Sequence, residues 1–176
     1  MKKVLMNVFM IIVLVAGMLS LTGCTSGKSV TVKSENDEFS YQAKFKLSGN
    51  DEVTEYDEED PESARIENEK ENYVLDLYID GEYASAYAED KESAKEGNEK
   101  YAETKFGSYE GYTIDNDGDI QGIILLDSKD EYRNIYIIFD LYLFDESAEN
   151  TDIDAIYKSE TVQNILNKIE YKSAKK

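Results

Sequence analysis

The segment that most constrains the fold is residues 132–144, the longest strand-like apolar run outside the first 25 residues. Its side chains alternate between two sides, and one side is predicted to carry Ile135, Ile137, Phe139, Leu141 and Leu143. The other side also has large side chains, those of Tyr136, Ile138 and Tyr142. A strand with two such faces is expected at the centre of a sheet, with both faces covered.

This strand closes a predicted antiparallel meander that spans residues 109–144. Residues 120–126 are rich in β-favouring side chains, and residues 127–131 are predicted to turn the chain back on itself. The meander is the best organised part of the chain, so we expect the sheet to be built around it.

Two earlier strands are predicted from the same alternation of apolar and polar residues. They occupy residues 39–47 and 73–79, and turn residues follow them at 48–51 and 80–82. Residues 30–38 are polar and are interpreted as a mixture of tether and edge strand. These segments extend the predicted antiparallel sheet towards the N-terminus.

Two segments are predicted to be helical. Residues 89–104 are mainly Ala, Glu and Lys and weakly favour a surface helix that breaks near Gly97. Residues 159–171 show clearer signals, because Ser159 suits an N-cap and Glu160 suits the first turn. One apolar stripe of this helix contains Val162, Ile165, Leu166 and Ile169. The predicted fold class is therefore α+β, an antiparallel meander sheet flanked by helices.

The N-terminus has the three parts of a secretory signal. Lys2 and Lys3 form a positive start, residues 8–19 form an unbroken apolar stretch, and small residues follow. A stretch of this length is too short for a stable transmembrane helix, which needs about 20 apolar residues. We therefore expect residues 1–23 to be a signal peptide rather than a membrane span.

The leader ends in Leu21-Thr22-Gly23-Cys24, and Cys24 is the only cysteine of the chain. This pattern resembles the signal of bacterial lipoproteins, whose cysteine carries a diacylglycerol on its sulfur and becomes the first residue after cleavage. The resemblance implies lipidation at Cys24 and a place on the extracytoplasmic face of the cell membrane. Two acyl chains anchor a protein stably, whereas one is marginal. The alternatives are an ordinary cleaved signal with a chance cysteine and a short anchor helix.

Length and charge describe the chain after the leader. Residues 24–34 are predicted to be the lipidated cysteine and its tether, and residues 35–176 are predicted to form a single domain. Beyond residue 23 the chain has 17 basic and 38 acidic residues, a net charge of −21. This balance argues against a nucleic-acid partner and repels anionic lipid. The lipid on Cys24 is therefore expected to do the anchoring, with the body held off the membrane by charge.

Composition excludes several kinds of chemistry. The chain has no histidine, and its one cysteine is expected to be acylated, so Ser-His-Asp and Cys-His nucleophile systems cannot form. Zinc sites of the usual Cys/His type are excluded for the same reason. No cofactor is expected. The lysines near the C-terminus are interpreted as complementing the helix dipole and aiding solubility rather than as a binding patch; they are Lys168, Lys172, Lys175 and Lys176.

Two acidic stretches invite a cation-binding interpretation. Residues 51–71 hold eleven acidic residues but fit no defined cage, so they are predicted to form a solvated, mobile loop between strands. Asp115, Asp117 and Asp119 alternate as calcium ligands do, but neither register of an EF-hand loop supplies the closing glutamate. A hairpin turn through Asp117-Gly118 is therefore favoured, and the three aspartates stay weak metal candidates.

Three stretches together resemble the PsbP-like domain across most of residues 35–171. They are the aromatic strand at 39–47, the step Gly107-Ser108-Tyr109-Glu110-Gly111-Tyr112 into the meander, and the closing helix around Tyr157-Lys158-Ser159-Glu160. The resemblance implies an antiparallel sheet flanked by helices and a role in binding rather than catalysis. The very acidic residues 51–71 depart from this pattern.

Three functions from different classes follow from these observations. The first is a non-catalytic binding module for a protein or cell-envelope partner, displayed outside the membrane. The second is a ligand or cation binder that uses its carboxylates. The third is a hydrolase with a carboxylate pair about 5 to 9.5 Å apart in a cleft. A concave pocket with convergent acids favours the second or third, and a sheet without such a pocket favours the first.

Overall fold

The structure is a computed structural model that describes residues 27–35, 39–57, 61–82, 84–98, 100–130, 133–148 and 152–176. The predicted signal peptide at residues 1–23 and the predicted lipidation site Cys24 lie outside the described residues. Residues 27–176 contain every strand, helix and core residue that the structure describes. None of the described helices is long and apolar enough to cross a membrane.

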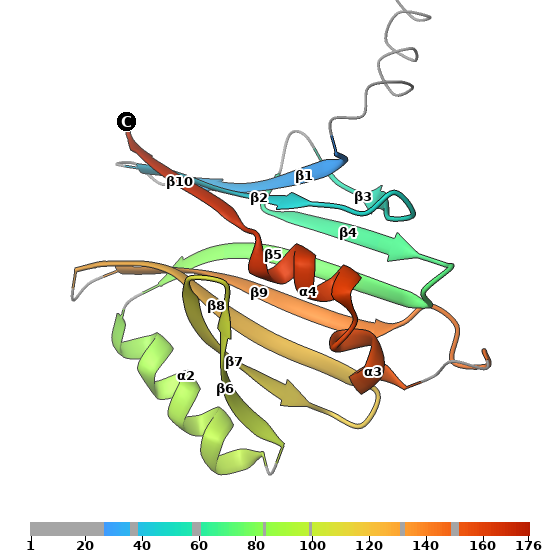
Figure 1. Cartoon of the computed structure of the whole chain (residues 1–176). Coiled ribbons are helices and arrows are strands. Elements are labelled where there is room, and N and C mark those ends of the chain that lie inside the picture. Colours follow the sequence, from blue (N-terminus) through green and yellow to red (C-terminus); the bar gives the residue numbers. More distant parts are fainter. Residues whose placement is uncertain are drawn as a thin grey trace, which may run out of the picture.

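The described strands form two antiparallel sheets (Figure 1). The smaller sheet has the order β1 (Ser29–Glu35), β2 (Phe39–Lys46) and β10 (Glu170–Lys175). The larger sheet has seven strands in the order β3 (Glu52–Glu55), β4 (Ser63–Asn68), β5 (Tyr73–Glu82), β9 (Arg133–Leu143), β8 (Asp119–Asp130), β7 (Tyr109–Asp115) and β6 (Tyr101–Phe106). The helices are α2 (Ala84–Gly97), α3 (Ile153–Tyr157) and α4 (Glu160–Asn167). The predicted α+β class and the β7-β8-β9 meander are confirmed.

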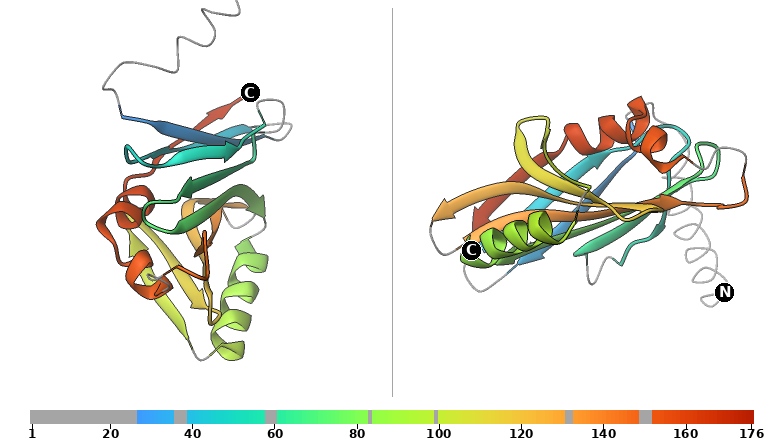
Figure 2. Two further views of the ribbon diagram at one scale, coloured as in Figure 1. Left: turned by 90° about the vertical axis from the view of Figure 1, so that its right-hand side faces the viewer. Right: turned by 90° about the horizontal axis from the view of Figure 1, so that it is seen from below.

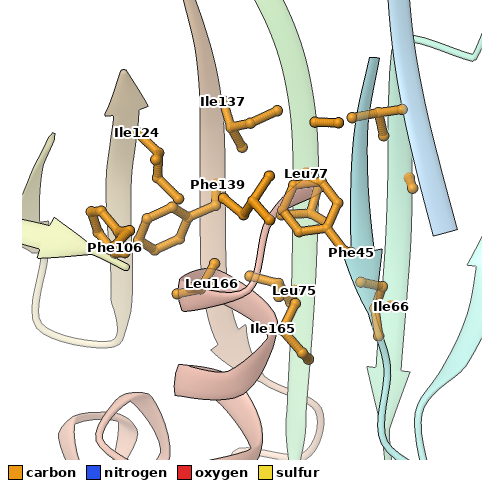
Figure 3. Packing of buried hydrophobic residues seen from close by; sticks show 14 of the residues in the cluster. Phe45, Ile66, Leu75, Leu77, Phe106, Ile124, Ile137, Phe139, Ile165 and Leu166 are labelled. Carbon is orange, nitrogen blue, oxygen red and sulfur yellow. The ribbon is translucent and has the colours of Figure 1, made fainter. Parts of the chain in front are cut away.

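The core lies between the inner faces of the two sheets, with α3 and α4 closing one side (Figures 1 and 3). Phe139 on β9 is fully buried, and its ring meets that of Phe106 edge-on with 5.5 Å between the ring centroids. Gly122 on β8 makes room for this ring, since a Cβ there would lie 2.3 Å from it. The predicted inner faces of β5 and β9 are buried at Tyr73, Leu75, Leu77, Ile79, Ile135, Ile137, Phe139 and Leu141, while Leu143 is only partly buried.

The closing helix begins as predicted but ends earlier. The Ser159 hydroxyl accepts the Val162 backbone N–H at 3.3 Å, which confirms the predicted N-cap. The apolar stripe at Val162, Ile165, Leu166 and Ile169 is buried. The helix ends at Asn167, however, and residues 170–175 form β10, which pairs with β2. The prediction of a helix to residue 171 was therefore wrong, and Lys172 and Lys175 lie on a strand.

The prediction that residues 51–71 form a mobile acidic loop was also wrong. It contains β3 and β4, which pair with each other, and β4 then pairs with β5. Ala64, Ile66 and Asn68 on β4 point into the core and are buried. Asp51 itself is fully buried. Apart from Asp51, the charged residues of this stretch that the structure describes are therefore displayed from one face of a sheet and from its turns.

The buried carboxylate of Asp51 forms hydrogen bonds with protein groups instead of water. Its carboxylate accepts the Tyr73 hydroxyl at 2.6 Å, the Asn68 side-chain amide at 2.7 Å and the Ser48 backbone N–H at 2.6 Å. Burial and this carboxylate raise the pKa of the Tyr73 phenol. Residue 51 thus ties the predicted turn at residues 48–51 to β4 and β5.

Several predicted boundaries shift because the strands are longer than the alternation indicated. Residues 80–82 continue β5, and residues 127–130 continue β8 through two irregularities in its register, so neither segment is the predicted turn. Helix α2 begins at Ala84 and ends at Gly97, where a break was predicted, while residues 101–104 belong to β6. Within the predicted tether, residues 29–34 form most of β1. Helix α3 was not predicted.

Candidate functional site

The outer face of the seven-stranded sheet, turned away from the three-stranded sheet, is only partly covered. Helix α2 packs on it (Figure 2). The ring centroid of Tyr87 on α2 lies 6.2 Å from that of Tyr136 and 6.4 Å from that of Tyr112. Tyr136 is buried, but Ile138 further along β9 is 37% exposed. The prediction that both faces of this strand are covered was therefore correct only at its Tyr136 end.

An open hollow of about 360 Å³ lies on the uncovered part of this face, across β3, β4, β5 and β9. We call it the outer-face hollow. Tyr78 and Ile138, each 37% exposed, are direct cross-strand partners within it. Its polar side chains are those of Glu55, Ser63, Arg65, Asp76 and Asp140.

Arg65 is held in place by two carboxylates. Its Nε and Nη2 atoms donate to the two carboxylate oxygens of Asp76 at 2.8 and 3.0 Å, and Nη1 donates to Glu55 at 2.7 Å. Such a two-pronged pair is geometrically specific and stronger than a neutral hydrogen bond. The hydrogen bonding of the guanidinium to Asp76 raises the pKa of Arg65 further.

The Asp76 carboxylate is fully engaged. Besides Arg65, it accepts the Tyr142 hydroxyl at 3.1 Å. Burial and this carboxylate raise the pKa of Tyr142 to about 12. Asp76 is therefore a fixed part of an ionic network rather than a free acid.

Asp140 is the direct cross-strand partner of Asp76, but its environment differs from that of Asp76. Its Oδ1 atom is shielded from solvent and has no hydrogen-bond partner among the described residues. Burial raises the pKa of Asp140, and the negative charges of Asp119 and Asp76 raise it further. The outer-face hollow thus places an acid whose pKa is raised beside one that is ion-paired.

Replacing Asp140 with asparagine is expected to stabilise the protein at pH 7. A raised pKa in the folded state means that stability is fully present below the unfolded-state pKa and is lost as pH rises through the folded-state value. The substituted amide carries no charge, so the variant should melt above the wild type at pH 7, and the difference should vanish below about pH 3.9. Melting curves across this range test the expectation. Parallel pH profiles for the two proteins would contradict it.

The three aspartates singled out as weak metal candidates lie at the β7-β8 hairpin. Asp117 has a φ of 58°, and the Asn116 N–H donates to the Asp119 carbonyl at 3.0 Å, so the predicted hairpin turn is confirmed. Lys100 forms ion pairs with Asp117 and, at 3.3 Å, with Asp115. Among the residues that the structure describes, no three acidic, histidine or cysteine side chains are grouped to hold a metal ion.

A second hollow of about 520 Å³ lies where the smaller sheet meets the turn before β4, and residues from both faces of β1, β2 and β10 line it. It is lined by strands of the smaller sheet and by Pro61 and Glu62, and we call it the inter-sheet hollow. The Ser34 hydroxyl donates to Glu62 at 2.8 Å across it, and the Tyr78 hydroxyl donates to the same carboxylate at 3.4 Å. Tyr41 and Ser173 also line it.

The sequence pointed to no site that matches either hollow, although Glu55, Glu62 and Arg65 belong to the acidic stretch at 51–71 that was considered for cation binding. A usable signal was present, because Asp76 and Asp140 each interrupt an otherwise apolar strand. Arg65 is one of only two basic residues in the acidic stretch at 51–71. Only the strand register shows that the three side chains meet.

No protein-family model, curated protein or solved structure matches the chain.

Proposed function

We propose that this protein is an extracytoplasmic lipoprotein, anchored in the cell membrane by lipid on Cys24, and that it is a non-catalytic binding module. The leader and the single cysteine at its end support the anchor. The folded body begins close to that cysteine, since β1 starts at Ser29. The partner is a protein or another component of the cell envelope.

The observation that carries the binding proposal is the uncovered centre of the seven-stranded sheet. Strands β5 and β9 are interior strands, yet Tyr78 and Ile138 stand exposed on their outer face. An arginine held in a fixed orientation lies in the same hollow. Tyrosine and arginine are enriched among the residues that dominate protein interfaces. The outer-face hollow is therefore our proposed partner site.

Charge complementarity gives the partner its chemical character. Three carboxylates of the outer-face hollow, on Glu55, Asp76 and Asp140, face one guanidinium, on Arg65. The whole chain is strongly acidic, with a net charge of −19. We propose that the partner presents a basic segment. The negative charge of this protein should increase the association rate of such a segment, and added salt should weaken the binding.

The state of the two paired aspartates supports binding over hydrolysis. A carboxylate-pair hydrolase needs one free carboxylate as nucleophile or base and one acid. Asp76 would have to be the carboxylate, but both of its oxygens already accept hydrogen bonds from Arg65, and one also accepts from Tyr142. An engaged carboxylate of this kind is a poor nucleophile.

A carboxylate-based ligand binder is the second candidate, and the inter-sheet hollow favours it. Its volume lies within the range of small-molecule sites, and it offers two carboxylates, two lysines and several hydroxyls. A small polar ligand with hydrogen-bond donors would suit Glu62, Ser34 and Ser173. A bound small molecule that contacts Glu62 would favour this candidate.

We also propose that the domain is PsbP-like. Support comes from the early strand β2, the β7-β8-β9 meander and the closing helix α4, which follow one another in the order that the resemblance implies. Fold alone does not give function, so the binding proposal rests on the outer-face hollow.

The proposed partner site predicts a selective loss of binding in the double variant Tyr78→Thr with Ile138→Thr. Threonine suits a strand, so the fold should be kept while the apolar contact area is removed. Capture of the membrane partner should fall at least tenfold, as for removal of two central interface residues. The measurement is quantitative capture from cross-linked cell envelopes, with the partner identified by mass spectrometry.

The matched control is Phe144→Thr, which removes an apolar side chain that is 40% exposed but lies outside the outer-face hollow. It should capture the same partner as the wild type does. Equal capture by the double variant would contradict the proposed site. Turnover of an envelope glycan, ester or phosphoester that is lost in Asp140→Asn would contradict the non-catalytic role.

A further inference from the structure

The three-stranded sheet gathers lysines on the face that points away from the core. In β1 and β2 the residues Val32, Ala43 and Phe45 point inward and are fully buried. Their neighbours in sequence therefore point outward. Lys33 and Lys172 are both cross-strand partners of Gln42, so they lie in one row on the outer side. We call this side the basic face; its lysines are Lys33, Lys44, Lys46, Lys172 and Lys176.

The acids on the basic face neutralise only part of its charge. Glu170 pairs with Lys46 at 2.8 Å, and Glu35 pairs with Lys176 at 3.1 Å. The other three lysines take part in none of the ion pairs among the described residues; they are Lys33, Lys44 and Lys172.

The sign of this face is opposite to that of the rest of the molecule. Its five lysines and two glutamates give a net charge of +3. The remainder of the chain beyond residue 23 has 12 basic and 36 acidic residues. The net charge of the chain therefore does not show that one face of the domain is positive.

The basic face is also the part of the body that is tied closest to the proposed anchor. Ser29, the first residue of β1, follows Cys24 by five residues, which reach at most about 18 Å when fully extended. The three-stranded sheet and helix α2 lie at opposite ends of the molecule (Figures 1 and 2). A lipid on Cys24 therefore keeps the sheet near the bilayer and leaves α2 free to point away.

We infer that the basic face docks on the anionic phospholipid headgroups of the membrane that holds the anchor. The inference rests on the proposed lipid on Cys24. Lysines near an anionic surface are attracted to it, and the attraction acts within a screening length of about 8 Å. The anchor brings the face into that range, while the acidic remainder is repelled. The docked protein stands with α2 away from the bilayer.

This orientation replaces two expectations from the sequence. The body was expected to be held off the membrane because its net charge is negative, and the C-terminal lysines were expected not to form a binding patch. Strand β10 places Lys172 beside β2, so residues more than 120 positions apart share one face. The sign of the local charge, rather than the total, then decides which side meets the lipid.

The test measures which end of the domain approaches an anionic bilayer. Residues 27–176 contain no cysteine, so Ser40→Cys on the outer side of β2 or Glu96→Cys on α2 gives a single labelling site. Each labelled domain is attached by an N-terminal histidine tag to vesicles that contain a nickel-chelating lipid and an energy-transfer acceptor lipid. Adding phosphatidylglycerol to phosphatidylcholine vesicles should raise transfer from position 40 at least twofold and leave position 96 unchanged.

Charge variants make the test specific. The triple variant Lys33→Gln, Lys44→Gln and Lys172→Gln should abolish the increase at position 40, as should high salt. A control that removes three lysines elsewhere should keep it; its changes are Lys70→Gln, Lys95→Gln and Lys105→Gln. No increase with phosphatidylglycerol, an equal increase at both positions, or equal losses in both triple variants would overturn the inference. Because the tag replaces the lipid, such a result would leave the proposed anchoring through Cys24 untouched.

Discussion

Replacing Asp51 with alanine is expected to destabilise the fold by about 3 to 5 kcal/mol, which is among the largest effects of any single acidic residue here. The carboxylate is fully buried and accepts hydrogen bonds from Ser48, Asn68 and Tyr73. Alanine removes the shared acceptor and leaves three donors without a partner. Each buried unsatisfied donor costs about 1 to 3 kcal/mol, and neighbouring losses of this kind are not additive.

Two further variants separate the effect of the buried hydrogen bonds on stability from the effect of charge. Asp51→Asn should cost less than alanine, because its side-chain oxygen still accepts from Asn68 and Tyr73 while its amide faces the Ser48 N–H. Glu69→Lys, on an exposed residue of the same acidic stretch, should change stability by no more than about 0.5 kcal/mol. Urea unfolding of the three variants measures all of these differences. Equal stability of Asp51→Ala and Glu69→Lys would show that Asp51 has no structural role.

The strands that sequence reasoning found are those with one uniformly apolar face. In residues 73–79 and 135–143 every second side chain is apolar, and all of the predicted inner positions of β5 are buried. Alternation of this kind is a local property of the sequence, so it can be recognised without knowing which strands pair. The same property located β2 at residues 39–46.

Residues 51–71 could not be predicted in the same way. Strand β4 has only two apolar inner residues, Ala64 and Ile66, and its third inner residue is Asn68. The burial of Asp51 depends on Asn68 and Tyr73, which lie 17 and 22 residues further along the chain. A carboxylate is normally exposed unless such partners exist, and single-sequence patterns do not show them.

The end of the closing helix could not be predicted from the sequence for a different reason. Ile169 continues the apolar stripe of α4 in sequence, although the helix has already ended at Asn167. No glycine or proline marks the stop. Three residues later the chain enters β10, which pairs with β2, a contact across more than 120 residues. The basic face, which depends on that pairing, was invisible for the same reason.

The outer-face hollow combines residues from four strands, so it too was beyond the reach of local patterns. Asp76 and Asp140 were visible as acids within apolar strands, but their meeting with Arg65 depends on the β4-β5-β9 register. The exposure of Ile138 depends on where α2 stops covering the sheet. Sequence alone therefore predicted the strands that build the site but not the site.

The lipid on Cys24 is the claim on which the location, the display of the outer-face hollow and the docking of the basic face all depend. Changing Cys24 to alanine removes the only sulfur that can be acylated in this way, so the expected effect is complete. The variant should lose its lipid label entirely, and it should no longer be retained in the membrane as a processed lipoprotein. Cys24→Ser, which keeps a small polar side chain, should behave identically.

Metabolic labelling with palmitate in a bacterial host tests this claim most directly, with the wild type, Cys24→Ala and Cys24→Ser compared at equal expression. We predict a labelled band for the wild type and none for either variant. Equal labelling of all three proteins, or an unlabelled wild type, would contradict the account.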